Sequence, residues 1–174
     1  GVTVSGGECL CQPEFTLEIL RRFKAEGLHT AVDTTGFVKS EIVERVIPYT
    51  DLFLYDLKHM DSEKHRQVVG VPNELILDNA RLIAERGGKM QVRIPLIPGF
   101  NADEENLRAT ARFCAGVREA VTVVQILPYH KFGTVKWDRL SRRPPVFDAE
   151  VPTEAEVDAA KAIFESFGLP VTIH

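Results

Sequence analysis

The stretch Val2-Thr3-Val4-Ser5-Gly6-Gly7-Glu8 is a short β-type run that ends in a glycine pair and an acidic residue. A helical pattern follows it, starting at Pro13 and stopping before Gly27, and both residues suit those ends of a helix. A strand, a turn with glycine and a helix, in this order, form the unit from which parallel sheets are built. The first 27 residues therefore predict an α/β fold with parallel strands.

The same alternation continues along the rest of the chain. The predicted strands are Val2–Val4, Leu28–Asp33, Leu52–Asp56, Met90–Pro95, Val121–Leu127 and Val171–Ile173. The predicted helices are Pro13–Glu26, Ser40–Val46, Ser62–Val68, Glu74–Arg86, Asp103–Val117 and Glu154–Phe167. Repeated strand–helix units pack with right-handed crossovers into an open doubly wound sheet or a barrel. No Gly-x-Gly-x-x-Gly fingerprint follows a strand, which makes the nucleotide-binding doubly wound fold the less favoured of the two.

Composition places the chain among ordinary globular domains. It has 174 residues, of which 44% are apolar and 26% charged, so we expect one domain over residues 1–174. The net charge of −4 argues against a nucleic-acid partner or an anionic membrane surface, and no apolar run approaches the roughly 20 residues that span a bilayer. The three cysteines, Cys9, Cys11 and Cys114, form no secreted disulfide framework and fit a reducing cytoplasm. We expect all three thiols to pack as small apolar groups.

Polar and glycine residues gather where the predicted strands end. They are Ser5–Glu8 after the first strand, Asp33–Gly36 at the second, Asp56–Lys58 at the third, Arg93 near the end of the fourth, and Tyr129–His130 after the fifth. In parallel α/β folds the carboxyl ends of the strands meet at the edge where ligands bind. Five strands in succession therefore predict a ligand site at this edge.

Each of these residues also has a simpler interpretation. The Gly6-Gly7 pair can serve only a tight turn, or it can let a ligand approach the backbone, with Glu8 placed to accept hydrogen bonds from an ammonium group. Asp33 and Asp56 can be strand-end caps. With the Thr34 hydroxyl and a strand carbonyl, they can also form an all-oxygen site for a hard cation.

The basic residues at the strand ends are harder to explain as surface charge. Lys58 lies three residues after the apolar run at residues 52–55. Arg93 lies inside an apolar strand, where a charge needs a partner or an anion. His130 on its own is most simply a structural histidine. The residues alone thus predict a site for an amino group, a carboxylate and a cation, but they do not indicate which reaction the site catalyses.

Taken in order, these motifs resemble those of the radical S-adenosylmethionine (radical SAM) enzymes that activate glycyl-radical enzymes, the pyruvate formate-lyase activating enzyme type. The resemblance covers nearly the whole chain. It rests on Gly1–Glu8, Asp33-Thr-Thr-Gly-Phe37, Asp56-Leu-Lys58, Arg93-Ile-Pro-Leu-Ile-Pro-Gly99, and Leu127-Pro-Tyr-His-Lys-Phe-Gly133 with Lys136-Trp137.

The resemblance implies an incomplete TIM-like (β/α)6 partial barrel, here missing its first strand, that binds S-adenosylmethionine across its strand ends. It also implies generation of a 5′-deoxyadenosyl radical, which takes hydrogen from a glycine of the partner enzyme, with a flavodoxin or ferredoxin as electron donor. The implied cofactor-binding residues are Ser5, Gly6, Gly7, Glu8, Asp33, Lys58 and His130, and the implied monovalent-cation ligands are Asp33, Thr34, the Leu54 carbonyl and Asp56. Arg93, the implied catalytic residue, would face the partner's glycine loop.

The family's Cys-x3-Cys-x2-Cys loop, which holds a [4Fe–4S] cluster, is absent from the chain. Cys9 and Cys11 lack the spacing to replace it. We therefore expect the cluster only in a parent protein, with this chain inactive alone, and dimerisation through an exposed Val2–Val4 edge.

Two other functions stay open. Lys58 at a strand end could form a Schiff base in a lyase or aldolase. The chain could also be a binding module that keeps a cofactor or partner surface without catalysis.

Overall fold

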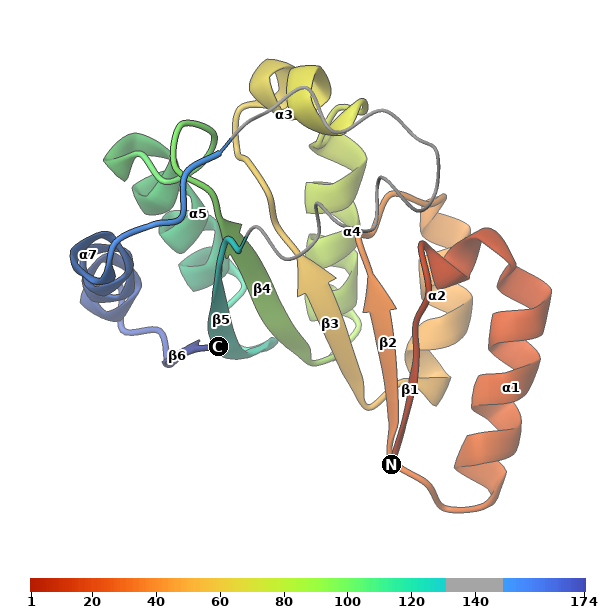
Figure 1. Ribbon diagram of the computed structural model, residues 1–174. Coiled ribbons are helices and arrows are strands. Elements are labelled where there is room, and N and C mark those ends of the chain that lie inside the picture. The colour runs from red at the N-terminus through yellow and green to blue at the C-terminus, as the bar shows by residue number, and fades with distance from the viewer. Residues whose placement is uncertain (131–148) are drawn as a thin grey trace.

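The computed structural model describes residues 1–130 and 149–174 as six parallel strands that alternate with helices (Figure 1). The strands are β1 (Val2–Val4), β2 (Thr30–Thr34), β3 (Leu52–Asp56), β4 (Met90–Leu96), β5 (Val121–Pro128) and β6 (Val171–Ile173). The helices are α1 (Pro13–Ala25), α2 (Ser40–Val46), α3 (Ser62–Val69), α4 (Glu74–Glu85), α5 (Glu104–Gly116) and α7 (Glu154–Ser166), with short 3-10 turns η1 (Cys9–Cys11) and η2 (Ile47–Tyr49).

The strands are hydrogen-bonded in chain order from β1 to β6, and every pairing is parallel. An open sheet in sequential order is the arrangement of a partial barrel, whereas a doubly wound sheet reverses its strand order at a switch point. Of the two architectures compatible with the strand–helix alternation, the partial barrel is therefore the one observed.

The two faces of the sheet differ in chemistry because side chains alternate along each strand. In β4, Met90, Val92 and Ile94 are buried, while the intervening Gln91 and Arg93 are only half-buried. The apolar face packs against α1, α2, α4 and α5, which lie together on one side of the sheet in Figure 1. The opposite face is less buried, and it carries charged side chains near the strand ends beside partly buried apolar ones such as Leu54.

The predicted elements are all present, and their ends differ from the prediction by two residues at most. Strand β2 begins at Thr30 rather than Leu28, because Gly27 adopts a φ of +72° and the Leu28 N–H bonds back to the Phe23 carbonyl of α1. Helix α5 begins at Glu104, with Asp103 as the cap whose side chain accepts from the Asn106 N–H. No described helix has the length and apolar character needed to cross a membrane.

Candidate functional site at the strand ends

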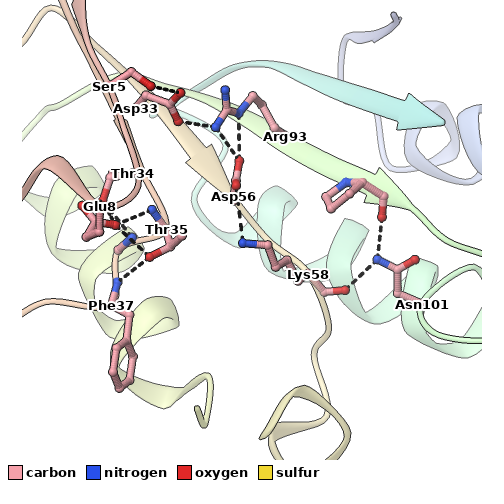
Figure 2. Close-up of polar contacts among 12 residues, drawn as sticks. Ser5, Glu8, Asp33, Thr34, Thr35, Phe37, Asp56, Lys58, Arg93 and Asn101 are labelled. Carbon is pink, nitrogen blue, oxygen red and sulfur yellow. Dashed lines mark hydrogen bonds and ion pairs between the residues drawn. The ribbon is translucent and has the colours of Figure 1, made fainter. Parts of the chain in front are cut away.

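The polar face of the sheet brings together acidic and basic side chains from three neighbouring strands. Asp33 pairs in register with Leu54, and Asp56 pairs with Arg93, so all four side chains point to the same face near the carboxyl ends of the strands. Figure 2 shows Asp33, Asp56 and Arg93 converging. The sequence prediction that these residues share one edge is thus met by their geometry.

Arg93 is the centre of this charge cluster. Its Nε donates to Asp56 Oδ1 at 2.8 Å, and its Nη2 donates to Asp33 Oδ1 and lies 2.7 Å from Asp56 Oδ1 as an ion pair. Burial on its own lowers the pKa of the guanidinium, but the Asp56 and Asp33 carboxylates outweigh it, so the pKa of Arg93 is raised. The guanidinium thus ties the ends of β2, β3 and β4 together.

The other carboxylate oxygens of the cluster also have partners. The Ser5 hydroxyl donates to Asp33 Oδ2 at 2.8 Å, and the Lys58 ammonium lies 3.5 Å from Asp56 Oδ2. The side chains of Arg93, Asp56, Asp33 and Lys58 are between 18% and 27% exposed, so the cluster is accessible from solvent on one side. The negative charges of the two carboxylates equal the positive charges of Arg93 and Lys58, so the cluster has no net charge.

The Glu8 side chain accepts hydrogen bonds from neighbouring residues of the chain. Its carboxylate accepts from the Thr34 and Thr35 hydroxyls at 2.8 Å, from the Thr35 N–H at 2.9 Å and from the Leu10 N–H at 3.2 Å. These bonds clamp the loop after β1 to the end of β2, as Figure 2 shows. Glu8, which the sequence predicts as an ammonium acceptor, therefore also clamps this loop.

The glycine pair leaves space beside this clamp. Gly6 and Gly7 have φ angles of +107° and +58°, and a Cβ added to either would meet no atom within 4 Å. Such backbone is open to a ligand, and a side chain there would be strained. A glycine turn with open space above it therefore leaves room for a ligand to approach the backbone closely.

The remaining predicted residues divide between the two faces. The Thr34 side chain is buried on the helical face, opposite Asp33, and its hydroxyl faces Glu8. The side chains of Leu54, Asp33 and Asp56 share the open face, while His130 is exposed just beyond β5. Residues 131–148, which include Lys131–Gly133 and Lys136-Trp137 of the predicted motif, lie outside the described residues.

Two asparagines support the site and were missed in the sequence. Asn101 is fully buried and donates to the carbonyls of Lys58 and Pro95, so it joins the loops after β3 and β4. Asn79 in α4 donates to the carbonyls of Gly36 and Val38, which holds the loop after β2. In the sequence, the only sign of a structural role for Asn101 is its position just after the turn at Gly99. The sequence around Asn79 gives no such sign.

The cysteines do not fit an iron–sulfur cluster. The Cys9 thiol is buried and donates to the Asp33 carbonyl at 3.4 Å, while burial raises its pKa to about 11, with further contributions from Glu8 and Asp33. Cys114 is buried in α5, and burial raises the pKa of its thiol to about 12. The expectation that all three thiols are buried is wrong for Cys11, which is exposed at the end of η1. Across the described residues no three His, Cys, Asp or Glu side chains converge as metal ligands.

A groove of about 770 Å³ lies elsewhere, between the C-terminal ends of α4 and α5. It is lined by Arg81, Phe113 and Arg118 among others, and it lies on the helical layer. The strand-end site is thus separate from it.

Comparisons with known proteins show which family this chain is related to. The family model for the radical SAM superfamily matches residues 1–111. The isethionate sulfite-lyase activating enzyme of Oleidesulfovibrio alaskensis is 43% identical over 88% of this chain and 50% of its own length. The pyruvate formate-lyase 1-activating enzyme of Escherichia coli K12 is 33% identical over 97% of this chain and 69% of its own length.

The solved structures include one domain of nearly the same extent. A crystal structure of a domain of pyruvate-formate lyase-activating enzyme from Bacteroides vulgatus superposes with a TM-score of 0.85 and 39% identity, covering 100% of this chain and 98% of that domain. The chain spans about half the length of the first curated relatives that it matches. It belongs to the radical SAM superfamily, and within it to the glycyl-radical-enzyme activating enzymes.

Proposed function

We propose that the protein to which this chain belongs activates a glycyl-radical enzyme of the pyruvate formate-lyase type by removing a hydrogen atom from one glycine of that partner. The observation that supports this most is the polar cluster at the strand ends of a chain whose similar proteins are activating enzymes. The chemistry is that of S-adenosylmethionine cleaved at a [4Fe–4S] cluster, which together supply the 5′-deoxyadenosyl radical.

In this proposal the chain's own residues bind and orient the cofactor. Ser5, Gly6 and Gly7 form one wall, where the open backbone admits the methionine moiety, and Glu8 fixes that wall to β2. Lys58 supplies a positive charge for the carboxylate. His130 contacts the carboxylate or the ribose.

Arg93, at the open edge, faces the glycine loop of the partner. Asp33, Asp56 and the Leu54 carbonyl surround a monovalent cation, while the Thr34 hydroxyl stays bonded to Glu8 on the other face. A flavodoxin or ferredoxin supplies the electron, the protein works in the cytoplasm, and residues 1–174 form one domain.

The test uses the protein encoded by the gene that contains this chain, purified and loaded with iron and sulfide without oxygen. With S-adenosylmethionine and a reductant, we expect 5′-deoxyadenosine by chromatography and a glycyl-radical signal by electron paramagnetic resonance in the correct partner. Candidate partners are a pyruvate formate-lyase, a choline lyase, a dehydratase and a decarboxylase, each compared with a variant that has alanine at the radical glycine. Formation of 5′-deoxyadenosine without a partner radical in any of them would contradict the proposal.

The Schiff-base alternative gains no support from the surroundings of Lys58. Its ammonium is paired with Asp56 and partly exposed, whereas an amine nucleophile is typically activated in an apolar pocket or beside another cation. Borohydride trapping with carbonyl substrates tests it directly, and a covalent adduct at Lys58 would revive it.

A further inference from the structure

We propose that Arg93 acts as a built-in occupant of the position between Asp33 and Asp56, and that a cationic ligand group enters there only by displacing it. The displaced guanidinium then turns toward the open edge of the sheet. The exchange couples the binding of a positively charged ligand to the availability of Arg93 for a second molecule. It rests on the proposed function only for the identity of these two molecules.

The first argument is the occupancy of the carboxylate oxygens. Asp33 Oδ1 and Asp56 Oδ1 both accept from Arg93, Asp33 Oδ2 accepts from Ser5, and Asp56 Oδ2 faces Lys58. All four oxygens therefore have a partner from the chain itself. A cation that arrives at this cluster finds no unengaged carboxylate oxygen.

The second argument is charge balance. Two carboxylates and the cations of Arg93 and Lys58 sum to zero in a cluster whose side chains are mostly covered. A further cation that enters beside the guanidinium leaves an excess positive charge at short range, which is unfavourable away from bulk water. If the cation replaces the guanidinium, the balance is kept.

The third argument is the position of Arg93. It lies near the carboxyl end of β4, on the open face, between Asp56 of β3 and Gln125 of β5 in the register of the sheet. A guanidinium released there can donate to the backbone carbonyls or a carboxylate of an extended loop. The ligand chemistry is thus a primary ammonium or a bare monovalent cation between the aspartates, and a partner loop at Arg93.

The expected consequence is positive coupling. The cationic ligand makes Arg93 available, and a loop that binds Arg93 leaves the aspartates open to the ligand, so each tightens the binding of the other by the same factor. Under the proposed function, the monovalent cation between the aspartates and the glycine loop of the partner are this pair, and S-adenosylmethionine is tested as a second source of the cationic group.

The experiment compares the chain with its Arg93→Gln variant by cation titration. Potassium chloride is added at constant ionic strength, balanced with tetramethylammonium chloride, and binding is followed by thermal midpoint and by the Arg93 Nε–H resonance in NMR. We expect potassium to bind about tenfold more tightly to Arg93→Gln than to the wild type, and to shift the Arg93 resonance of the wild type. Equal affinity with an unchanged resonance overturns the proposal, as does a failure of potassium to bind either form.

A second arm uses S-adenosylmethionine, with uncharged methylthioadenosine as the control ligand. Tighter binding of S-adenosylmethionine to Arg93→Gln, with methylthioadenosine unaffected, supports exchange at the ammonium, whereas weaker binding to the variant refutes it. If potassium shows the exchange and S-adenosylmethionine binds neither form, the exchange stands and the proposed cofactor site fails.

Arg93→Gln leaves two aspartates facing each other and can impair folding. Arg93→Lys serves as the second variant, because it keeps the charge and loses the planar fork that spans both carboxylates. We expect its potassium affinity to lie between those of the other two forms. An affinity equal to that of the wild type would overturn the proposal.

Discussion

Replacing Gly36 by alanine tests how the loop after β2 is held beside the site. Gly36 has a φ of +73°, and a Cβ built on it lies 1.8 Å from the hydroxyl oxygen and 2.4 Å from Cζ of Tyr55. Tyr55 is fully buried, and its hydroxyl donates to the Ile76 carbonyl at 2.6 Å. The Gly36 carbonyl is itself held by Asn79. Neither side of the contact can therefore move without losing a hydrogen bond.

The cost follows from three contributions. The left-handed backbone conformation costs alanine about 1 kcal/mol. Overpacking against a buried side chain costs about 1–3 kcal/mol. Loss of the Tyr55 hydrogen bond adds about 1 kcal/mol. We expect Gly36→Ala to lower the free energy of unfolding by about 3–5 kcal/mol in total.

The matched control is Gly27→Ala. Gly27 has a φ of +72°, and an added Cβ meets nothing within 4 Å, so only the backbone contribution of about 1 kcal/mol applies. Both variants are measured by urea unfolding followed by circular dichroism. Tyr55→Phe removes the hydroxyl oxygen, which is the atom nearest to the added Cβ. The double variant Gly36→Ala/Tyr55→Phe should therefore lose less unfolding free energy than the sum of the two single variants. Equal costs for the two glycine variants would refute the packing argument.

Three further predictions concern the hydrogen bonds of Glu8, the ion pair of Asp51 with Lys24, and the three thiols. Glu8→Gln should lower the free energy of unfolding in urea by about 1–3 kcal/mol. The Thr35 and Leu10 N–H groups bond to different oxygens of the Glu8 carboxylate, so the amide nitrogen of glutamine must face one of these two donors. Glu18→Gln on the exposed side of α1 is its control, and an equal loss there would contradict the clamp. The Lys24 ammonium and the Thr30 N–H lower the pKa of Asp51 from 3.8 to about 2, so its contribution is present above about pH 4 and lost as the pH falls toward 2. The difference in unfolding free energy between the wild type and Asp51→Asn should shrink over that window, and a difference independent of pH would be evidence against the ion pair. A thiol-reactive reagent at neutral pH should label Cys11 alone in the native chain and all three cysteines in denaturant. The reason is that Cys9 and Cys114 are buried and the pKa values of their thiols are raised. Labelling of Cys9 or Cys114 as fast as that of Cys11 in the native chain would contradict their burial.

The elements could be predicted from the sequence because each depends on local signals. Pro13 at the start of α1, Gly27 after it and Asp103 before α5 are readable as helix ends, and the order of the strands follows from the alternation. The edge at which the polar residues meet was predictable for the same reason, since the carboxyl ends of parallel strands lie together.

The partners of these residues could not be predicted in this way. Glu8 has two hydroxyls and two N–H groups within reach only because the loop after β1 folds over the end of β2. The bridge from Arg93 to Asp33 joins residues that are 60 positions apart, and it depends on the register of three strands. Whether Cys9 or Cys11 is buried depends on the turn of η1, which no pattern in the sequence indicated.

The most direct test of the proposed cofactor site is an NMR titration of the ¹⁵N-labelled chain with S-adenosylmethionine. The account predicts that the largest shift changes occur at Gly6, Gly7 and residues 33–36, together with the Arg93 side chain. Changes concentrated at the groove between α4 and α5, around Arg81 and Arg118, or no changes at saturating ligand, would contradict it.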